Sequence, residues 1–196
     1  MQRLTALLAC VLLISSCNNI DDEPLTETAL IAGETEQPGV QYTPIGTNYL
    51  FTDVAAVNGL LVSKVGVDLD KDGADDLAFE LNSGSEDGLQ LLMVKSLQAT
   101  LIPEGVDTHQ SLVRQKGDLL APYTMNWLSN EWLFLHYAKA DESWTAGSIT
   151  TEAGFLPIQI DNHTGWLELQ LLTDASQEKI WGINLKQLAI SQFNQN

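Results

Sequence analysis

The chain has 196 residues, of which 9 are basic and 26 are acidic, so its formal net charge at pH 7 is −17. Such a charge repels phosphate backbones and suits divalent cations, and we therefore expect no nucleic-acid partner. The 3 histidines have no partner at metal-ligand spacing, and the sequence contains no GxSxG turn, HExxH motif or phosphate-binding glycine loop, so we expect no enzymatic activity.

The first residues predict an export signal. Residues 1–3 give a short positive start, and residues 4–14 form an apolar run that is too short to span a membrane but suits a signal-peptide core. The sequence ISSC at positions 14–17 closes this run and resembles the lipobox of bacterial lipoproteins. The resemblance implies that residues 1–16 are removed and that Cys17 is lipidated. An ordinary secretory signal with a cysteine near its end is the alternative.

Residues 17–47 are predicted to form a lipidated, flexible and acidic tether. Cys10 would leave with the signal peptide, so the mature chain would keep only Cys17 and could form no internal disulfide. Thr, Glu, Gly and Pro dominate positions 25–47 without a periodic apolar pattern, which predicts a flexible segment.

The acidic residues at positions 21–23 resemble the export signal that one group of Gram-negative bacteria uses for surface lipoproteins. This resemblance implies a protein that is held in the outer membrane by its lipid and exposed at the cell surface. Two or more acyl chains would make such an anchor stable.

Residues 48–196 are predicted to fold as one all-β domain. Apolar residues alternate as in half-buried strands in the segments 76–81, 155–161, 166–172 and 180–185. Strands buried on both faces, or helices as the alternative, are expected at 89–101 and 131–138. Gly, Asn, Asp and Pro predict breaks at 82–84, 86–88, 103–105 and 161–163. Many short strands at this spacing indicate an antiparallel β-sandwich of a jelly-roll-like kind.

The stretch VDLDKDGADDLAFEL at positions 67–81 predicts a metal site before one of these strands. Its DxDxDGxxxD spacing sets four aspartates two or four residues apart around a glycine. Calcium takes about six to eight oxygen ligands, and alternate residues of a tight loop aim their carboxylates at one centre while a glycine permits the bend. We therefore expect one calcium ion to be held by Asp68, Asp70, Asp72, Asp76 and the carbonyl of Ala74.

The loop resembles the first nine positions of the calcium-binding EF-hand loop. At the twelfth position Phe79 stands where an EF-hand has a bidentate glutamate, and no helical pattern flanks the loop. The resemblance therefore implies an EF-like loop that feeds a strand, with an ion that stiffens the fold. A solvated turn without metal is the alternative, although four carboxylates this close repel one another unless a cation is present.

The chain also resembles a set of uncharacterised secreted or lipid-anchored bacterial proteins. That resemblance rests on the DxDxDG loop, on the segment GDLL at 117–120 before Trp127, and on the segment TGWLEL at 164–169. The pattern usually has tyrosine in place of Thr164. The resemblance would cover most of residues 50–192, and it implies a β-sandwich and no known reaction.

The tryptophans divide into two groups. Trp132 and Trp181 fall on strand faces that they share with other apolar residues, which predicts core positions. By alternation Trp166 shares its face with polar residues, and Trp144 lies in a polar segment, so either could be an exposed ring on which a sugar stacks. For Trp166 the alternative is a strand residue beneath a covering loop.

Two functions are consistent with these features. The first is a calcium-stabilised structural or interaction module at the cell surface, whose partner could be another surface protein. The second is a glycan-binding lipoprotein that serves polysaccharide uptake. Carboxylate pairs such as Asp141 with Glu142, or Asp174 with Glu178, could belong to a glycan hydrolase, but with 26 acidic residues such pairs arise by chance.

Overall fold

The structure is a computed structural model that describes residues 30–52, 54–84, 88–98, 100–103, 112–121, 125–139, 142–146, 153–174 and 179–192. Residues 139 and 142–146 are described by their backbone alone. Every regular element in these ranges is a β-strand, which confirms the predicted all-β class. Within the same ranges, no helix is long and apolar enough to cross a membrane. The predicted signal peptide and Cys17 lie outside the described residues.

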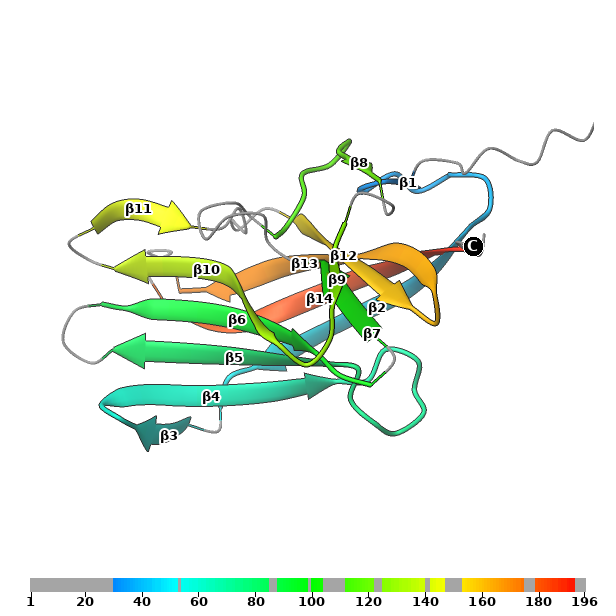
Figure 1. Cartoon of the computed structure of the whole chain (residues 1–196). Helices are drawn as coiled ribbons and strands as arrows, with labels where there is room; N and C mark the ends of the chain where they lie inside the picture. The colour runs from blue at the N-terminus through cyan, green and yellow to red at the C-terminus, as the bar shows by residue number, and fades with distance from the viewer. Residues whose placement is uncertain are drawn as a thin grey trace, which may run out of the picture.

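Two six-stranded antiparallel sheets stack face to face, as the predicted β-sandwich requires (Figure 1). The front sheet of Figure 1 runs, edge to edge, through β11 (Glu142–Ala146), β10 (Trp132–Lys139), β6 (Gln90–Ser96), β5 (Leu77–Gly84), β4 (Leu60–Val67) and β3 (Val54–Val57). The back sheet runs through β2 (Val40–Leu50), β14 (Ile180–Ser191), β13 (His163–Thr173), β12 (Gly154–Ile160), β7 (Thr100–Pro103) and β9 (Trp127–Leu128).

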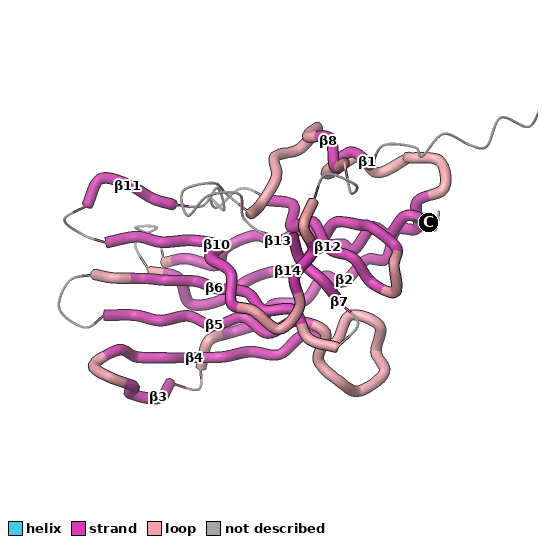
Figure 2. Tube along the Cα trace, in the orientation of Figure 1, coloured by secondary structure: helices cyan, strands magenta, loops and turns pink. Residues whose placement is uncertain are grey.

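A small third sheet lies against the sandwich (Figure 2). It pairs β1 (Leu30–Ile31) with β8 (Leu119–Leu120) in antiparallel register. Figure 2 draws these two strands beside β12 and β13, away from the front sheet. One region of the molecule therefore has three layers.

The main core lies between the inner faces of the two large sheets. Leu77 and Phe79 of the front sheet are fully buried, as are Leu167 and Leu169 of the back sheet, and all four belong to one apolar cluster. These residues follow the predicted alternation, because every second residue of a strand points to the same face. The alternation of apolar residues in the sequence therefore identifies which face of each strand is buried in the core.

The predicted breaks are partly confirmed. Asp161 and Asn162, with φ of 49° and 65°, form the two-residue turn between β12 and β13. The strand β7 ends at Pro103 as expected. The break predicted at 82–84 is wrong, because β5 continues to Gly84 and stays paired with β4. The segment 89–101 forms two strands instead of one, separated by a turn at Gln98 with φ of 51°.

The predicted tether is too long at its C-terminal end. Residues 30–47 include β1 and most of β2, and β2 is paired along its length with β14. Sequence reasoning missed β2 because its alternation is interrupted around Pro44, where the pairing register shifts. Val40 and Tyr42 still pack on one apolar cluster, while Ile45 and Tyr49 pack on the other. Positions 17–29 of the predicted tether lie outside the described residues.

Trp166 is not an exposed platform, and this prediction is corrected. Its side chain is 0% exposed. The indole packs at 5.2 Å, edge to face, against the ring of Phe155 and at 6.1 Å from the ring of Tyr42. Leu30 of β1 and Leu120 of β8 complete this second apolar cluster. Trp166 does lie on the outer face of the back sheet, but the small third sheet covers it there.

Trp181 is exposed, contrary to its predicted core position. In the pairing of β14 with β13, Gly182 lies opposite Leu172 and Ile180 lies opposite Thr173, so Trp181 is the extra residue of a β-bulge. A bulge changes which residues of a strand face the core. Ile180 consequently takes the buried position, and Trp181 keeps 46% of its surface exposed.

The two tryptophans provide a matched test of these assignments. We expect Trp166→Ala to lower the free energy of unfolding by about 3 to 5 kcal/mol, because it empties a packed site between two layers. Trp181→Ala should cost clearly less than that, because nearly half of this side chain is already exposed and less buried contact is lost. Urea denaturation of the two variants measures the difference. Equal losses would contradict the layered arrangement.

Candidate metal centre

The aspartate-rich segment forms the connection between β4 and β5. It leaves β4 after Val67 and enters β5 at Leu77. The N–H of Asp76 donates to the carbonyl of Val67 at 2.8 Å, and the carbonyl of Asp76 accepts from the N–H of Leu97 at 2.7 Å. The side chain of Leu69 is buried in the main core. The loop is therefore fixed at its base and in its middle.

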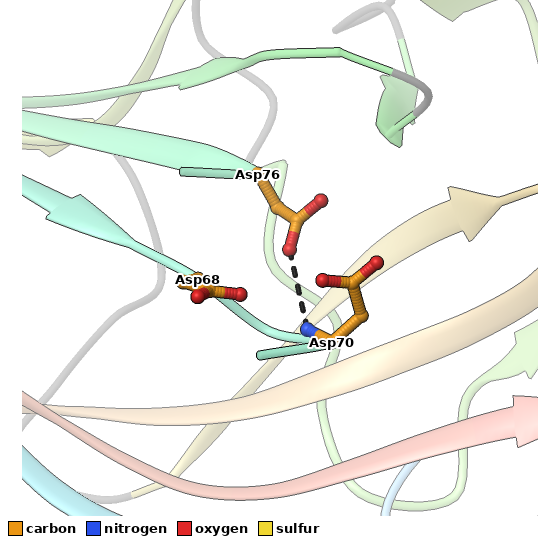
Figure 3. A group of neighbouring side chains, drawn as sticks. All are labelled: Asp68, Asp70 and Asp76. Carbon is orange, nitrogen blue, oxygen red and sulfur yellow. Dashed lines mark hydrogen bonds between the residues drawn. The ribbon is translucent and has the colours of Figure 1, made fainter. Parts of the chain in front are cut away.

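Three of the predicted carboxylates converge. Asp68, Asp70 and Asp76 each offer an oxygen, and these oxygens lie within 4.8 Å of one another (Figure 3). Figure 3 shows the three side chains approaching from the two arms of the loop. Hard divalent cations bind oxygen ligands of this kind. The cluster could therefore hold a metal ion.

Asp76 is the buried member of the cluster, with only 7% of its surface exposed. One carboxylate oxygen, Oδ2, accepts from the N–H of Leu69 at 2.7 Å and from that of Asp70 at 3.4 Å. The other oxygen, Oδ1, accepts from the hydroxyl of Thr100 at 3.2 Å. A buried carboxylate requires such partners. Thr100 belongs to β7, so this side chain joins the loop to the back sheet.

Short-range hydrogen bonds wind the rest of the loop. Asp68 accepts from the N–H of Lys71 at 2.6 Å and from that of Gly73 at 2.9 Å, one on each oxygen. Asp70 accepts from the N–H of Asp72 at 3.0 Å. Lys71 and Gly73 have φ of 66° and 95°, and the second of these strongly favours glycine. The bend expected at the glycine is therefore present.

The other two predicted ligands, Asp72 and the carbonyl of Ala74, are not among the three converging carboxylates. The Oδ1 of Asp72 accepts from the N–H of Ala74 at 2.8 Å. Ligation by Asp72 and by the carbonyl of Ala74 stays a prediction. Phe79, at the EF-hand's glutamate position, is fully buried in the main core. The loop lacks that ligand because its position already belongs to a core strand.

The cluster carries uncompensated negative charge. In the part of the chain that the structure describes, no lysine or arginine forms an ion pair with its three aspartates. The hydrogen bond from the backbone of Asp72 lowers the pKa of Asp70, but desolvation and the charges of Asp76, Asp72 and Asp68 together raise it above its ordinary value. Repulsion of this kind is relieved by a proton or by a cation.

Tyr49 is a neighbour of the loop that sequence reasoning missed. It lies on β2, and its pKa is raised above 10.0 by burial first, and then by the negative charges of Asp68 and Asp75. Nothing in the local sequence around Tyr49 points to a site, because β2 meets the loop only through the packing of the sheets. The same holds for Thr100.

The remaining predicted site residues are not placed together. Trp144 lies in β11, whose side chains are not described. Cys17 lies outside the described residues, as do Asp141 and Glu178 of the two carboxylate pairs.

Comparison with known proteins gives no relative. No known protein family matches the chain, and neither a curated protein nor a solved structure is significantly similar to it. The site must therefore be interpreted from its own chemistry.

The raised pKa of Tyr49 predicts an alkaline loss of stability. Because the unfolded chain ionises this phenol near pH 10 and the folded chain ionises it only at higher pH, stability is fully present below pH 10 and declines as the pH rises through the folded pKa. Absorbance at 295 nm, taken as the difference between the native protein and Tyr49→Phe, follows the titration. Asp68→Asn should move it to lower pH by removing one negative charge. A transition at or below pH 10 in the native protein would contradict the placement.

Proposed function

We propose that this protein is a non-enzymatic, calcium-stabilised β-sandwich module that is anchored by lipid at the bacterial cell surface. The observation that carries the metal part is the convergence of three aspartate oxygens within 4.8 Å in the β4–β5 loop. One of these carboxylates is buried, and a further aspartate, Asp72, stands in the same loop. No reaction is proposed.

Calcium is the cation that best suits this donor set. All three converging groups are hard oxygen donors, and among the described residues no histidine or cysteine joins the cluster. Calcium accepts irregular oxygen geometries that include carboxylates, backbone carbonyls and water, whereas magnesium requires a tight octahedron and keeps its water. Zinc sites ordinarily include histidine or cysteine. The loop's likeness to the first part of an EF-hand supports the same ion.

The ion would act as a structural brace. The loop contacts the back sheet through the hydrogen bond between Asp76 and Thr100 of β7, and the charges of Asp68 and Asp75 act on Tyr49 of β2. A cation that pulls Asp68 and Asp70 toward Asp76 would hold the loop in the one shape that makes these contacts. The two sheets would then be tied together at the end of the sandwich where the loop lies.

Calcium should raise the melting temperature of the protein. A ligand that binds only the folded state at about a hundredfold excess over its dissociation constant adds about 2.7 kcal/mol, which corresponds to roughly 5 to 10 °C for a chain of this size. Thermal melts with chelator, with calcium and with magnesium measure the effect, and magnesium should substitute poorly. Identical melts in all three would mean that the loop is a solvated turn.

Two isosteric variants separate the ligands from the rest of the loop. Asp70→Asn should weaken the calcium response strongly, because it removes one negative charge from the converging group. Asp72→Asn should weaken it less, since the Asp72 carboxylate is not among the three that converge and an asparagine oxygen can still accept from the N–H of Ala74. A calcium response lost in Asp72→Asn and kept in Asp70→Asn would refute this ligand set.

The membrane part of the proposal rests on the ISSC sequence at positions 14–17 and on the acidic residues that follow. A lipid on Cys17 would place the described sandwich at the end of a segment of about a dozen residues, from 18 to 29. Such a segment could span at most roughly 40 Å when fully extended. The sandwich would therefore stay close to the membrane surface.

Lipidation can be tested directly. Metabolic labelling with a fatty acid should mark the native protein, and Cys17→Ser should be unlabelled and either soluble or uncut. Cys10→Ser is the control and should be labelled normally, because Cys10 lies inside the predicted signal peptide. A native protein that takes up no label would remove this part of the proposal.

A further inference from the structure

We propose that Asn58 is a site of spontaneous deamidation, and that the isoaspartate form of this residue releases the edge strand β3 from the front sheet. Asn58 and Gly59 form the turn between β3 and β4. The inference goes beyond the calcium-stabilised module described above and does not depend on it. The metal loop follows β4 after Val67, whereas this turn precedes β4 at Leu60.

The turn consists of the residue pair that its geometry favours. Val57 pairs with Leu60, so Asn58 and Gly59 form the whole connection, and their φ angles are 50° and 84°. Two positive φ values are typical of the two-residue turns that match the twist of paired strands, and asparagine followed by glycine adopts them readily. The sequence contains no other Asn-Gly pair. The fold therefore sets the asparagine with the least hindered following residue at a hairpin tip.

The groups that would react are accessible. Asn58 and Gly59 are both exposed, and a Cβ placed on Gly59 would meet no atom within 4 Å. Among the described residues, neither the side chain of Asn58 nor the N–H of Gly59 has a hydrogen-bond partner. Glycine also has no side chain that would hinder its own nitrogen. The attacking nitrogen and the carbon that it attacks are therefore both open to water.

The reaction requires water alone. The Gly59 nitrogen loses its proton and attacks Cγ of Asn58, a C–N bond forms, and the side-chain nitrogen leaves as ammonia. The product is a succinimide ring, which water opens at one of its two carbonyl carbons. Opening at Cγ gives aspartate. Opening at the main-chain carbonyl carbon gives isoaspartate, in which the main chain runs through Cβ and Cγ. One water is consumed for each ammonia released, and nothing is oxidised or reduced.

The strand before the turn is held weakly enough to let the ring close. Figure 1 shows β3 at the outer edge of the front sheet, and among the described strands β4 alone pairs with it. All four residues of β3 are exposed. A segment with few buried contacts opens at a low cost in free energy. Ring closure needs rotation about the Cα–C bond of Asn58, and local opening of β3 permits that rotation while the sandwich stays folded.

The two products have different consequences for β3. Aspartate tolerates a positive φ much as asparagine does, so it fits the same turn. Isoaspartate adds a methylene group to the main chain, and the register of a hairpin depends on the length and type of its turn. Val57 then no longer lies opposite Leu60. Because no buried side chain holds β3, the strand should leave the sheet, and β4 should become its free edge.

Peptide mapping by mass spectrometry tests the modification in the full chain, purified in detergent and incubated at mildly alkaline pH. Asn58 should gain the mass that replaces NH2 by OH, and its peptide should be labelled by an isoaspartate methyltransferase. Two other asparagines are internal references. Asn162 is also exposed in a two-residue turn, but His163 follows it, and Asn82 is buried in β5. Both should stay intact over the time in which half of Asn58 reacts.

Two variants separate the modification from its effect on β3. Asn58→Gly keeps the turn, because glycine accepts a positive φ, and removes the reactive amide, so the label on this peptide should disappear. Freshly prepared Asn58→Asp carries the charge of one product on an unaltered main chain. Hydrogen exchange of the β3 amides should be fast in the isoaspartate fraction of the aged protein and slow in both variants.

The proposal is overturned if Asn58 stays intact in the folded protein, if Asn162 or Asn82 reacts as fast, or if the isoaspartate fraction keeps the hydrogen-exchange protection of β3. The calcium response gives a separate result, because the metal loop lies at the other end of β4. Asn58→Gly should respond to calcium as the native protein does, so failure of the calcium proposal leaves this test unchanged.

Discussion

The inner faces of the two large sheets bury one another, and the other features of the molecule follow from that contact. Phe79 and Leu77 on one side and Leu167 and Leu169 on the other have no exposed surface. Fully burying one such side chain contributes about 1.5 to 3 kcal/mol. Once these faces are in contact, each strand end is fixed, and so is the end of the sandwich at which each connecting loop lies. In the aspartate loop, the same packing also brings negatively charged side chains close together.

The β4–β5 loop combines a buried core residue with three carboxylates that lie close together. The side chain of Leu69 points into the core. Its neighbours Asp68 and Asp70 both point the other way, because residues two apart in an extended segment share a side, and their carboxylates therefore meet. Asp76 is drawn into the same region by the start of β5 and is satisfied by N–H groups and by Thr100. The fold itself therefore assembles the three carboxylates. A cation would relieve their repulsion.

The two outer faces of the sandwich differ. On the back sheet, the second apolar cluster lies under β1 and β8, which cover Trp166 and Phe155. On the front sheet, Phe134 keeps half of its surface exposed, and Trp132 is flanked by two lysines. Aromatic residues thus occur on both outer faces, and those of the second apolar cluster on the back sheet lie beneath β1 and β8.

Local patterns in the sequence determined the fold class, the alternation of the core strands and the spacing of the aspartates. They could do so because a strand has a period of two and a metal loop is formed by neighbouring residues. Only the tertiary structure decided that Trp166 is covered, that a bulge exposes Trp181, and that residues 30–47 contain β1 and most of β2. It also brought Thr100 and Tyr49 near the loop and set Phe134 and Trp132 on the outer face of the front sheet. Each of these outcomes depends on contacts between residues that lie far apart in the chain, which no local pattern records.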